Sequence, residues 1–149
     1  MNVRRARTTD LPRLIELGRA MREESLVYFP EVDARHTLEM WEAGLSLPDT
    51  FACFVAEDER VVGFLTACIS TFFFSPEKFA QHDIFYVSPE ARGSSAARRL
   101  VKAYEDWAGE HANHAIIRLD TNLKPEKIDK FYQRLGFEPM GGMYMKWLQ

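Results

Sequence analysis

The sequence has few cysteines, with only Cys53 and Cys68 among its 149 residues. Both lie in strand-like segments on either side of an acidic turn at residues 57–60. A tight hairpin at that turn would set Cys53 opposite a residue near Phe64. Cys68 would then lie about four residues further along, roughly 13 Å away at the rise of a strand. Because a disulfide needs Cα atoms within about 7 Å of each other, this spacing predicts two buried thiols.

Long apolar runs are also missing. No stretch approaches the roughly 20 apolar residues that are needed to span a bilayer. The N-terminal arginines Arg4, Arg5 and Arg7 are not followed by the apolar segment of a secretory signal. We therefore expect a cytoplasmic protein that has no membrane partner.

An excess of positive charge is absent. The chain has 19 Lys and Arg residues against 22 Asp and Glu residues, a formal net charge of −3 and a pI near 5.8. Such a balance gives no field that would hold a polyanion, so nucleic acid is not an expected partner. The P-loop motif G-x-x-x-x-G-K-[ST] and the dinucleotide motif G-x-G-x-x-G are missing too, which argues against a P-loop hydrolase and a Rossmann dehydrogenase.

The composition that is present belongs to an ordinary globular domain, with 46% hydrophobic and 28% charged residues. At this length the chain can bury one core, so we expect a single domain over residues 1–149. Hydrophobic spacing and turn residues predict the order β-α-α-β-β-β-α-β-α-β-β. The strands are expected over 2–7, 51–56, 61–71, 82–87, 115–119, 137–140 and 143–147, and the helices over 10–21, 33–45, 97–108 and 125–135. This order predicts an α/β (α+β) fold in which about four helices flank one mixed, mostly antiparallel sheet of about seven strands.

The most informative stretch covers residues 84–100. A strand there stops at Ser88-Pro89, small residues follow, and a helix begins. Small residues let the backbone approach a ligand closely, and the unpaired amides of a first helical turn attract an anion such as phosphate. A simpler interpretation is that Ser94 or Ser95 only caps the helix. The local pattern alone leaves both open.

Two ordered motifs in this region resemble those of the GNAT superfamily of N-acetyltransferases. Residues 92–97 read Arg-x-x-Ser-x-Ala after Val-Ser-Pro-Glu, similar to the family's R/Q-x-x-G-x-G/A, with Ser95 where a glycine is usual. Residues 131–137 are similar to its F-Y-x-x-x-G-F signature. The resemblance implies a GNAT fold that binds acetyl-CoA between the fourth and fifth strands. The cofactor-binding residues that it implies are Phe85, Tyr86, Val87, Arg92, Gly93, Ser94, Ser95, Ala96, Ala97 and Asn122.

Two candidate catalytic residues follow from the same resemblance. Tyr132 matches the tyrosine that often protonates the departing thiolate, which a phenol can do because its reference pKa, about 10, lies slightly above that of a thiol. Without the motif, Tyr132 is simply a core residue of an amphipathic helix. Asp83 lies where several members carry a carboxylate and could take a proton from the acceptor amine. It could equally be a charge at a strand edge.

The predicted activity is transfer of an acetyl group from acetyl-CoA to a primary amine of a small molecule or peptide. The amine would attack directly, since no cysteine lies in these motifs. The alternative is a GNAT fold that binds acyl-CoA without turnover, as a sensor or regulatory protein. Aromatic residues at 26–30 and 72–74 suggest an acceptor with an apolar part. No metal site is predicted, because His111 and His114 lack further ligands nearby in sequence, and the sequence is compatible with a homodimer.

Overall fold

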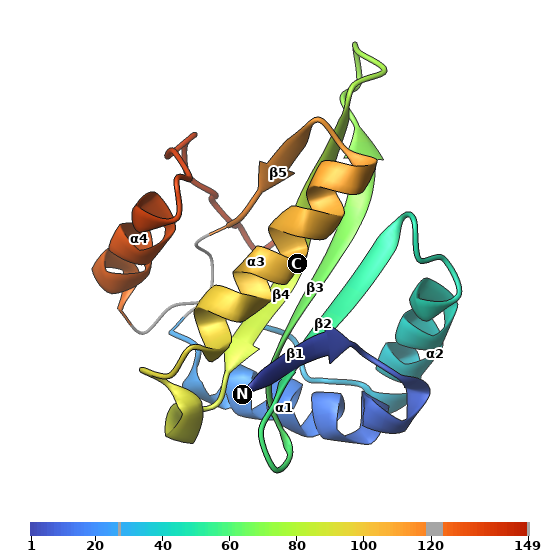
Figure 1. The fold of residues 1–149 in the computed structure, drawn as a ribbon, viewed down its shortest axis with the longest axis vertical. Coiled ribbons are helices and arrows are strands. Elements are labelled where there is room, and N and C mark those ends of the chain that lie inside the picture. Colours follow the sequence, from blue (N-terminus) through green and yellow to red (C-terminus); the bar gives the residue numbers. More distant parts are fainter. Residues whose placement is uncertain (27, 119–123, 149) are drawn as a thin grey trace.

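The computed structural model describes residues 1–26, 28–118 and 124–148. Figure 1 shows a sheet flanked by helices. The strands are β1 (Asn2–Arg5), β2 (Phe51–Glu57), β3 (Val61–Thr71), β4 (Lys78–Val87) and β5 (His114–Ile116). The helices are α1 (Leu11–Glu24), α2 (Ala34–Leu45), α3 (Ala96–His111) and α4 (Pro125–Arg134), and short 3-10 turns η1 (Thr8–Asp10) and η2 (Pro89–Ala91) precede α1 and α3. In the described residues no helix is both long and apolar enough to cross a bilayer.

The sheet is mixed, as predicted, with the order β1-β2-β3-β4-β5. All neighbouring strands are antiparallel except β4 and β5, which are parallel. The sheet has five strands in the described chain, so the prediction of about seven was too high. The four predicted helices are all present.

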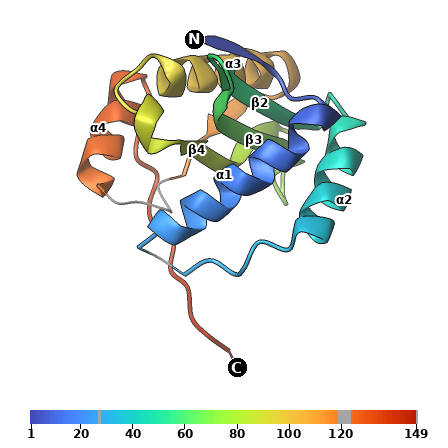
Figure 2. The same cartoon turned by 90° about the horizontal axis from the view of Figure 1, so that it is seen from below.

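The missing strands are those predicted on either side of Gly141-Gly142. Residues 137–148 form no regular structure, and Figure 2 shows this segment running away from the layers of the fold. A Gly-Gly pair is a strong local hairpin signal, but a two-stranded hairpin with no apolar surface to cover is at best marginally stable. The Gly-Gly pattern was therefore not sufficient to form the predicted hairpin.

Two strand boundaries and one register also differ from the predictions. β4 begins at Lys78 rather than at residue 82, because its first half pairs with β3 as far as Thr71. β5 ends at Ile116, and the predicted end of that strand, residue 119, lies outside the described residues. Cys53 pairs with Thr66, two residues beyond Phe64. One residue of the shift arises because the strands close at Glu57 and Val61 rather than at residues 57 and 60, and the β-bulge between Ala56 and Glu57 adds the other. Both cysteines are free thiols, Cys53 buried and Cys68 half-buried.

Two hydrophobic cores lie on the two faces of the sheet. One is built around α3, whose Leu100, Val101 and Tyr104 are fully buried. The other lies under α1 and α2, where Trp41 packs edge-on against Phe64 with ring centroids 5.8 Å apart. Figures 1 and 2 show α3 on one side of the sheet, α1 and α2 on the other, and α4 beside β5.

Candidate active site

The central feature of the site is a β-bulge in β4. The register pairs Thr66 with Ile84 and Ala67 with His82, which leaves Asp83 as the extra residue. A bulge bends its strand and increases the local twist. The pairing of β4 with β5 ends nearby at Gln81, so β4 has an open edge from His82 onward among the described residues.

Two backbone amides of β4 point toward this open edge. The amide of Ile84 donates to Thr66 Oγ1 at 3.1 Å, and the amide of Ser88 donates to Val62 O at 2.8 Å, both toward β3. Because amides alternate in direction along a strand, those of Phe85 and Val87 face the opposite edge. Two donors are thus held in place beside the gap between β4 and β5.

Tyr104 lies at the point where the two strands part, a role that the sequence did not reveal. Its hydroxyl is 2.9 Å from Ala80 O on β4 and 2.8 Å from Ile116 O on β5. The residue is fully buried, and this burial raises the pKa of its phenol. Its position within the predicted helix 97–108 gives no sign of these two hydrogen bonds.

The loop between β4 and α3 has the geometry of an anion site. Gly93 has φ +84°, a conformation that favours glycine. Ser95 is the N-cap residue of α3 but makes no side-chain capping bond, and the Oγ of Ser94 instead accepts a hydrogen bond from the Ala96 amide at 3.2 Å. The amides of Gly93, Ser95 and Ala97 have no backbone acceptor among the described residues. Unpaired amides at the start of a 16-residue helix attract negative charge.

Substitution of Gly93 by valine is expected to weaken acetyl-CoA binding about tenfold. A Cβ added at this position meets no atom within 4 Å, so close contact at the Cβ is not the obstacle. The obstacle is the positive φ, which costs an L residue about 1–2 kcal/mol and would turn the amides away. Gly109→Val is the control, because Gly109 in α3 is equally open and its φ is not positive. Equal affinity of the two variants, measured by calorimetry, would show that the amides do not hold the phosphate.

Arg92 does not point freely toward this loop, because its side chain is held elsewhere. Its Nε donates to Val87 O at 3.0 Å, and its Nη2 bonds to Glu24 Oε2 at the end of α1. Tyr86 donates to the other oxygen of Glu24, and Arg92 lies over the Tyr86 ring, 5.7 Å from its centroid. Glu24 therefore ties α1 to β4 and to the loop. The sequence gave no signal for it, since the ion pair joins residues 68 apart.

The Glu24→Gln variant is expected to unfold at a lower temperature. The change removes the charge from two hydrogen bonds, and because the ion pair is partly exposed we expect a loss of about 1 kcal/mol. For a chain of this size that corresponds to roughly 2–4 °C. Glu23→Gln is the matched control, with the same charge change at an exposed neighbour on the same helix. Equal melting temperatures of the two variants would show that the Glu24 bonds to Arg92 and Tyr86 do not stabilise the fold.

Asp83 lies between two polar groups, Cys68 and Arg118. The Cys68 thiol donates to its Oδ1 at 3.8 Å, and Arg118 Nη2 donates to its backbone carbonyl at 3.3 Å. Partial desolvation raises the pKa of the Asp83 carboxyl, while the Arg118 charge acts in the opposite direction. Burial and the Asp83 charge in turn raise the pKa of the Cys68 thiol. Asp83 is thus a better proton acceptor than an ordinary aspartate, and Cys68 is a poor nucleophile.

His82 links β4 to the segment after β5. It is buried, and its Nδ1 accepts a hydrogen bond from the Arg118 amide at 3.0 Å. Burial, with a smaller contribution from the Arg118 charge, lowers the pKa of His82 to about 4. The ring is therefore neutral at pH 7, and it joins the two strands beyond the point where their ladder ends.

Tyr132 lies in α4 with only 8% of its surface exposed, and its ring packs between Phe131 and Phe137. It lines a cleft of about 970 Å³ whose walls are β5, α4, residues 137–145 and the segment around Tyr28. Arg118 lines the same cleft and also bonds to Asp83. The bulge of β4 and the cleft of Tyr132 are therefore connected through Arg118.

The two aromatic segments expected around the acceptor are separated in the structure. Phe29 lines the cleft, whereas Phe72 packs against Phe79 and His114 at the start of β4. This is the end of β4 away from Val87. Asn122 lies outside the described residues. Within those residues, no group of three His, Cys, Asp or Glu side chains could hold a metal ion.

The fold is thus a mixed α/β sheet in which two parallel strands part beside a loop with unpaired backbone amides. The family model of the acetyltransferase (GNAT) family matches residues 18–137. The chain belongs to this family. The two motifs recognised in the sequence both lie within the matched range.

Solved structures show the same fold over nearly the whole chain. Glucosamine-6-phosphate N-acetyltransferase from Arabidopsis thaliana has a TM-score of 0.78 at 17% identity, covering 99% of this chain and 98% of its own. A putative acetyltransferase from Agrobacterium tumefaciens str. C58 has a TM-score of 0.78 at 21% identity, with coverages of 99% and 100%. AAC(6')-Iy in complex with the bisubstrate analogue CoA-S-monomethyl-acetylneamine has a TM-score of 0.76 at 20% identity, with coverages of 99% and 97%. No protein with a curated description matches the sequence.

Proposed function

We propose that the protein transfers an acetyl group from acetyl-CoA to a primary amine. The observation that carries this proposal is the continuity of β4 with the loop that follows it. One stretch of chain presents the Phe85 and Val87 amides at the gap and then the unpaired amides of Gly93, Ser95 and Ala97. Family membership and the CoA-based ligand in one structural neighbour support the same cofactor.

The residues present fit acetyl-CoA. Its pyrophosphate is an anion that the loop amides and the start of α3 would attract. Arg92 would position that loop through Glu24 and Val87, rather than by reaching the phosphate itself. Asn122 stays a predicted cofactor contact. Bound here, acetyl-CoA would supply the activated acetyl group.

Each side chain then has a defined task. Asp83 accepts a proton from the acceptor ammonium group, so that the amine nitrogen can form a bond to the acetyl carbon. The amides of Phe85 and Val87 stabilise the oxygen as it gains negative charge. Tyr132 donates its proton to the sulfur as the carbon–sulfur bond breaks. Cys68 stays protonated, which favours direct attack over an acyl-enzyme.

The acceptor would enter through the cleft that Tyr132 lines. That cleft is formed partly by aromatic and thioether side chains, including Phe29, Phe137 and Met140, so an amine with an apolar part fits it. Small-molecule and peptide amines remain the two acceptor classes. We expect a cytoplasmic enzyme whose partners include neither nucleic acid nor membrane.

The test combines cofactor binding with turnover. Acetyl-CoA at 100 times its Kd should stabilise the folded protein by about 2.7 kcal/mol, seen as a rise in melting temperature. A panel of small amines and peptides should then give free thiol with at least one acceptor. A thermal shift with no thiol release from any amine would favour the non-catalytic acyl-CoA-binding alternative, and no thermal shift would remove both.

A further inference from the structure

Arg118 brings a positive charge to the cleft that Tyr132 lines, and none of the steps above uses it. Among the described residues that line this cleft, Arg118 is the one basic side chain, and the acidic ones are Asp129 and Glu138. Asp129 accepts a hydrogen bond from Gln133 at 2.8 Å, and Glu138 is exposed. Because ligand clefts orient what they bind by a few fixed polar groups among apolar ones, the place of this single cation is informative.

The position of Arg118 is fixed by two hydrogen bonds to β4. Its backbone amide donates to Nδ1 of the buried His82 at 3.0 Å, and its Nη2 donates to the backbone carbonyl of Asp83 at 3.3 Å. A guanidinium has five N–H donors, which is enough to hold that carbonyl and a carboxylate together. Its planar fork also matches the two oxygens of a carboxylate. Arg118 therefore suits a carboxylate ligand better than a lysine would.

The guanidinium of Arg118 lies close to the proposed proton acceptor. It bonds to the main chain of Asp83 itself, and its charge lowers the pKa of the Asp83 carboxyl, against the effect of desolvation. An acceptor whose amine reaches Asp83 therefore brings its neighbouring atoms to Arg118. A second positive charge on those atoms would be repelled, whereas a negative charge would be attracted. The pair thus disfavours a polyamine and favours an amine with an anionic group beside it.

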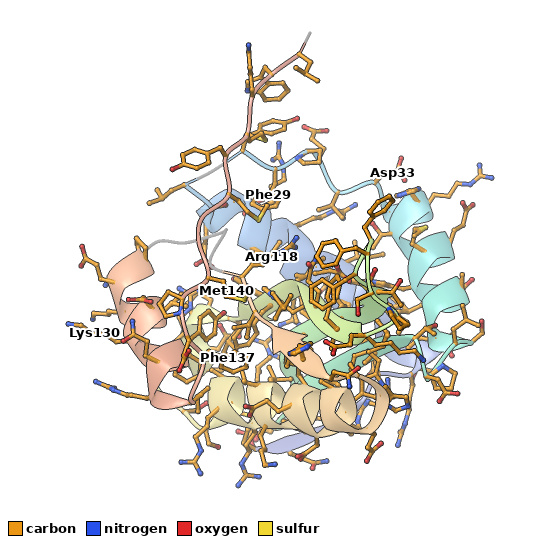
Figure 3. All side chains as sticks on the ribbon, turned by 90° about the horizontal axis from the view of Figure 1, so that it is seen from above. Phe29, Asp33, Arg118, Lys130, Phe137 and Met140 are labelled. Carbon is orange, nitrogen blue, oxygen red and sulfur yellow. The ribbon has the colours of Figure 1, made fainter. Side chains whose placement is uncertain are left out.

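The cleft also offers apolar surface next to Arg118. Phe29, Phe137 and Met140 line it together with Arg118, and Figure 3 shows Arg118 between Phe29 and Met140. A matching acceptor combines an amine, an adjacent anion and an apolar group. An α-amino acid has this combination, since its nitrogen lies only about 2.5 Å from its carboxyl carbon.

We propose that the acceptor is an α-amino acid with an apolar side chain, and that Arg118 selects it by binding its carboxylate. This inference rests on the proposed acetyl transfer. The α-nitrogen forms its bond to the acetyl carbon as the carbon–sulfur bond breaks. Asp83 takes a proton from the nitrogen and Tyr132 gives one to the sulfur, so an N-acetyl amino acid and free CoA leave.

Matched acceptors test the proposal on the unsubstituted protein. The kcat/KM for phenylalanine and leucine should exceed that for phenethylamine and isoamylamine, which lack only the carboxylate, by roughly 10–100-fold. Phenylalaninamide is the stricter control, because it keeps the shape of the amino acid without the charge and its amine loses a proton more readily. Equal or higher kcat/KM for the uncharged analogues, or for spermidine, would overturn the proposal.

Arg118→Gln should lower kcat/KM for phenylalanine by the same factor and change that for phenethylamine little. A purely structural Arg118 would lower both equally, which would overturn the assignment. Arg118→Lys keeps the charge but loses the fork, so it should lie between the two proteins. Lys130→Gln is the control and should keep the preference for the acid, because Lys130 is exposed and points outward from α4, away from Arg118 (Figure 3).

Calorimetry separates failure of this inference from failure of the proposed function. Phenylalanine is titrated into the complex with free CoA, where no transfer occurs, and should bind in the unsubstituted protein but not in Arg118→Gln. If amines are acetylated without preference for the carboxylate, the activity stands and the inference is wrong. If no amine is acetylated, the activity is wrong. Binding that depends on Arg118 then still supports the carboxylate site, and absence of binding overturns it.

Discussion

Replacing Tyr132 by phenylalanine should lower kcat roughly 10²-fold, the size expected when a general acid is lost. The affinity for acetyl-CoA should change little, because the ring and its packing against Phe131 and Phe137 remain. An effect on kcat without one on binding means that the lost interaction acts in the transition state. Steady-state kinetics and calorimetry on the same preparations provide both numbers.

The opposite result is expected if Tyr132 is a structural residue. Loss of the hydroxyl would then lower stability by about 1 kcal/mol and leave kcat nearly unchanged. Tyr104→Phe is the control for a structural tyrosine. Its hydroxyl joins β4 and β5 in the core, so its loss should lower the melting temperature. An unaltered kcat in Tyr132→Phe would remove Tyr132 as the acid.

Replacing Asp83 by asparagine should also lower kcat roughly 10²-fold at neutral pH, because the variant cannot accept the proton of the acceptor amine. In the unsubstituted protein the rate should fall as the pH drops through the pKa of Asp83. Although Asp83 is exposed by surface area, the surrounding chain partly desolvates its carboxyl and raises its pKa, so this acid limb should lie at a higher pH than for an aspartate without such neighbours. The limb should disappear in Asp83→Asn. Rate–pH profiles of the two proteins measure both effects.

The same pKa shift predicts the sign of the stability change. A carboxyl whose pKa is raised on folding binds its proton more tightly in the folded state, so its ionisation above that pKa costs stability. Asp83→Asn removes this cost and should melt at the same temperature as the unsubstituted protein or higher at pH 7. Asp106→Asn, on the exposed face of α3, is the control and should keep both kcat and the acid limb. If Asp83→Asn keeps the rate–pH profile of the unsubstituted protein, Asp83 is only a charge at a strand edge and not the proton acceptor.

Much of the fold follows from signals that act over a few residues. Asp33, where the predicted second helix begins, caps α2 by accepting a hydrogen bond from the His36 amide at 2.9 Å. Gly136 ends the helical region with φ +91°, as expected for a glycine after α4. Such features depend on neighbouring residues only, and sequence patterns therefore report them well.

The candidate site likewise combines features that neighbouring residues predict with features that depend on contacts between distant parts of the chain. The Gly93 loop was visible in the sequence, because its small residues and the helix after it are contiguous. Glu24 was not visible, since its pairing with Arg92 depends on how α1 crosses β4. The extra residue at Asp83 was not visible either, because a bulge is defined only against the partner strand.

The C-terminal segment shows where a local signal fails. Residues 137–147 have the pattern of a hairpin, yet strand pairing needs an edge and an apolar surface to cover, and neither is specified by the segment itself. By itself, then, the sequence determined the helices, most strand positions, the small-residue loop before α3 and the family. Only the tertiary structure decided the registers, the parting of β4 from β5 and the groups around Asp83 and Arg92, because these depend on contacts between residues far apart in the chain.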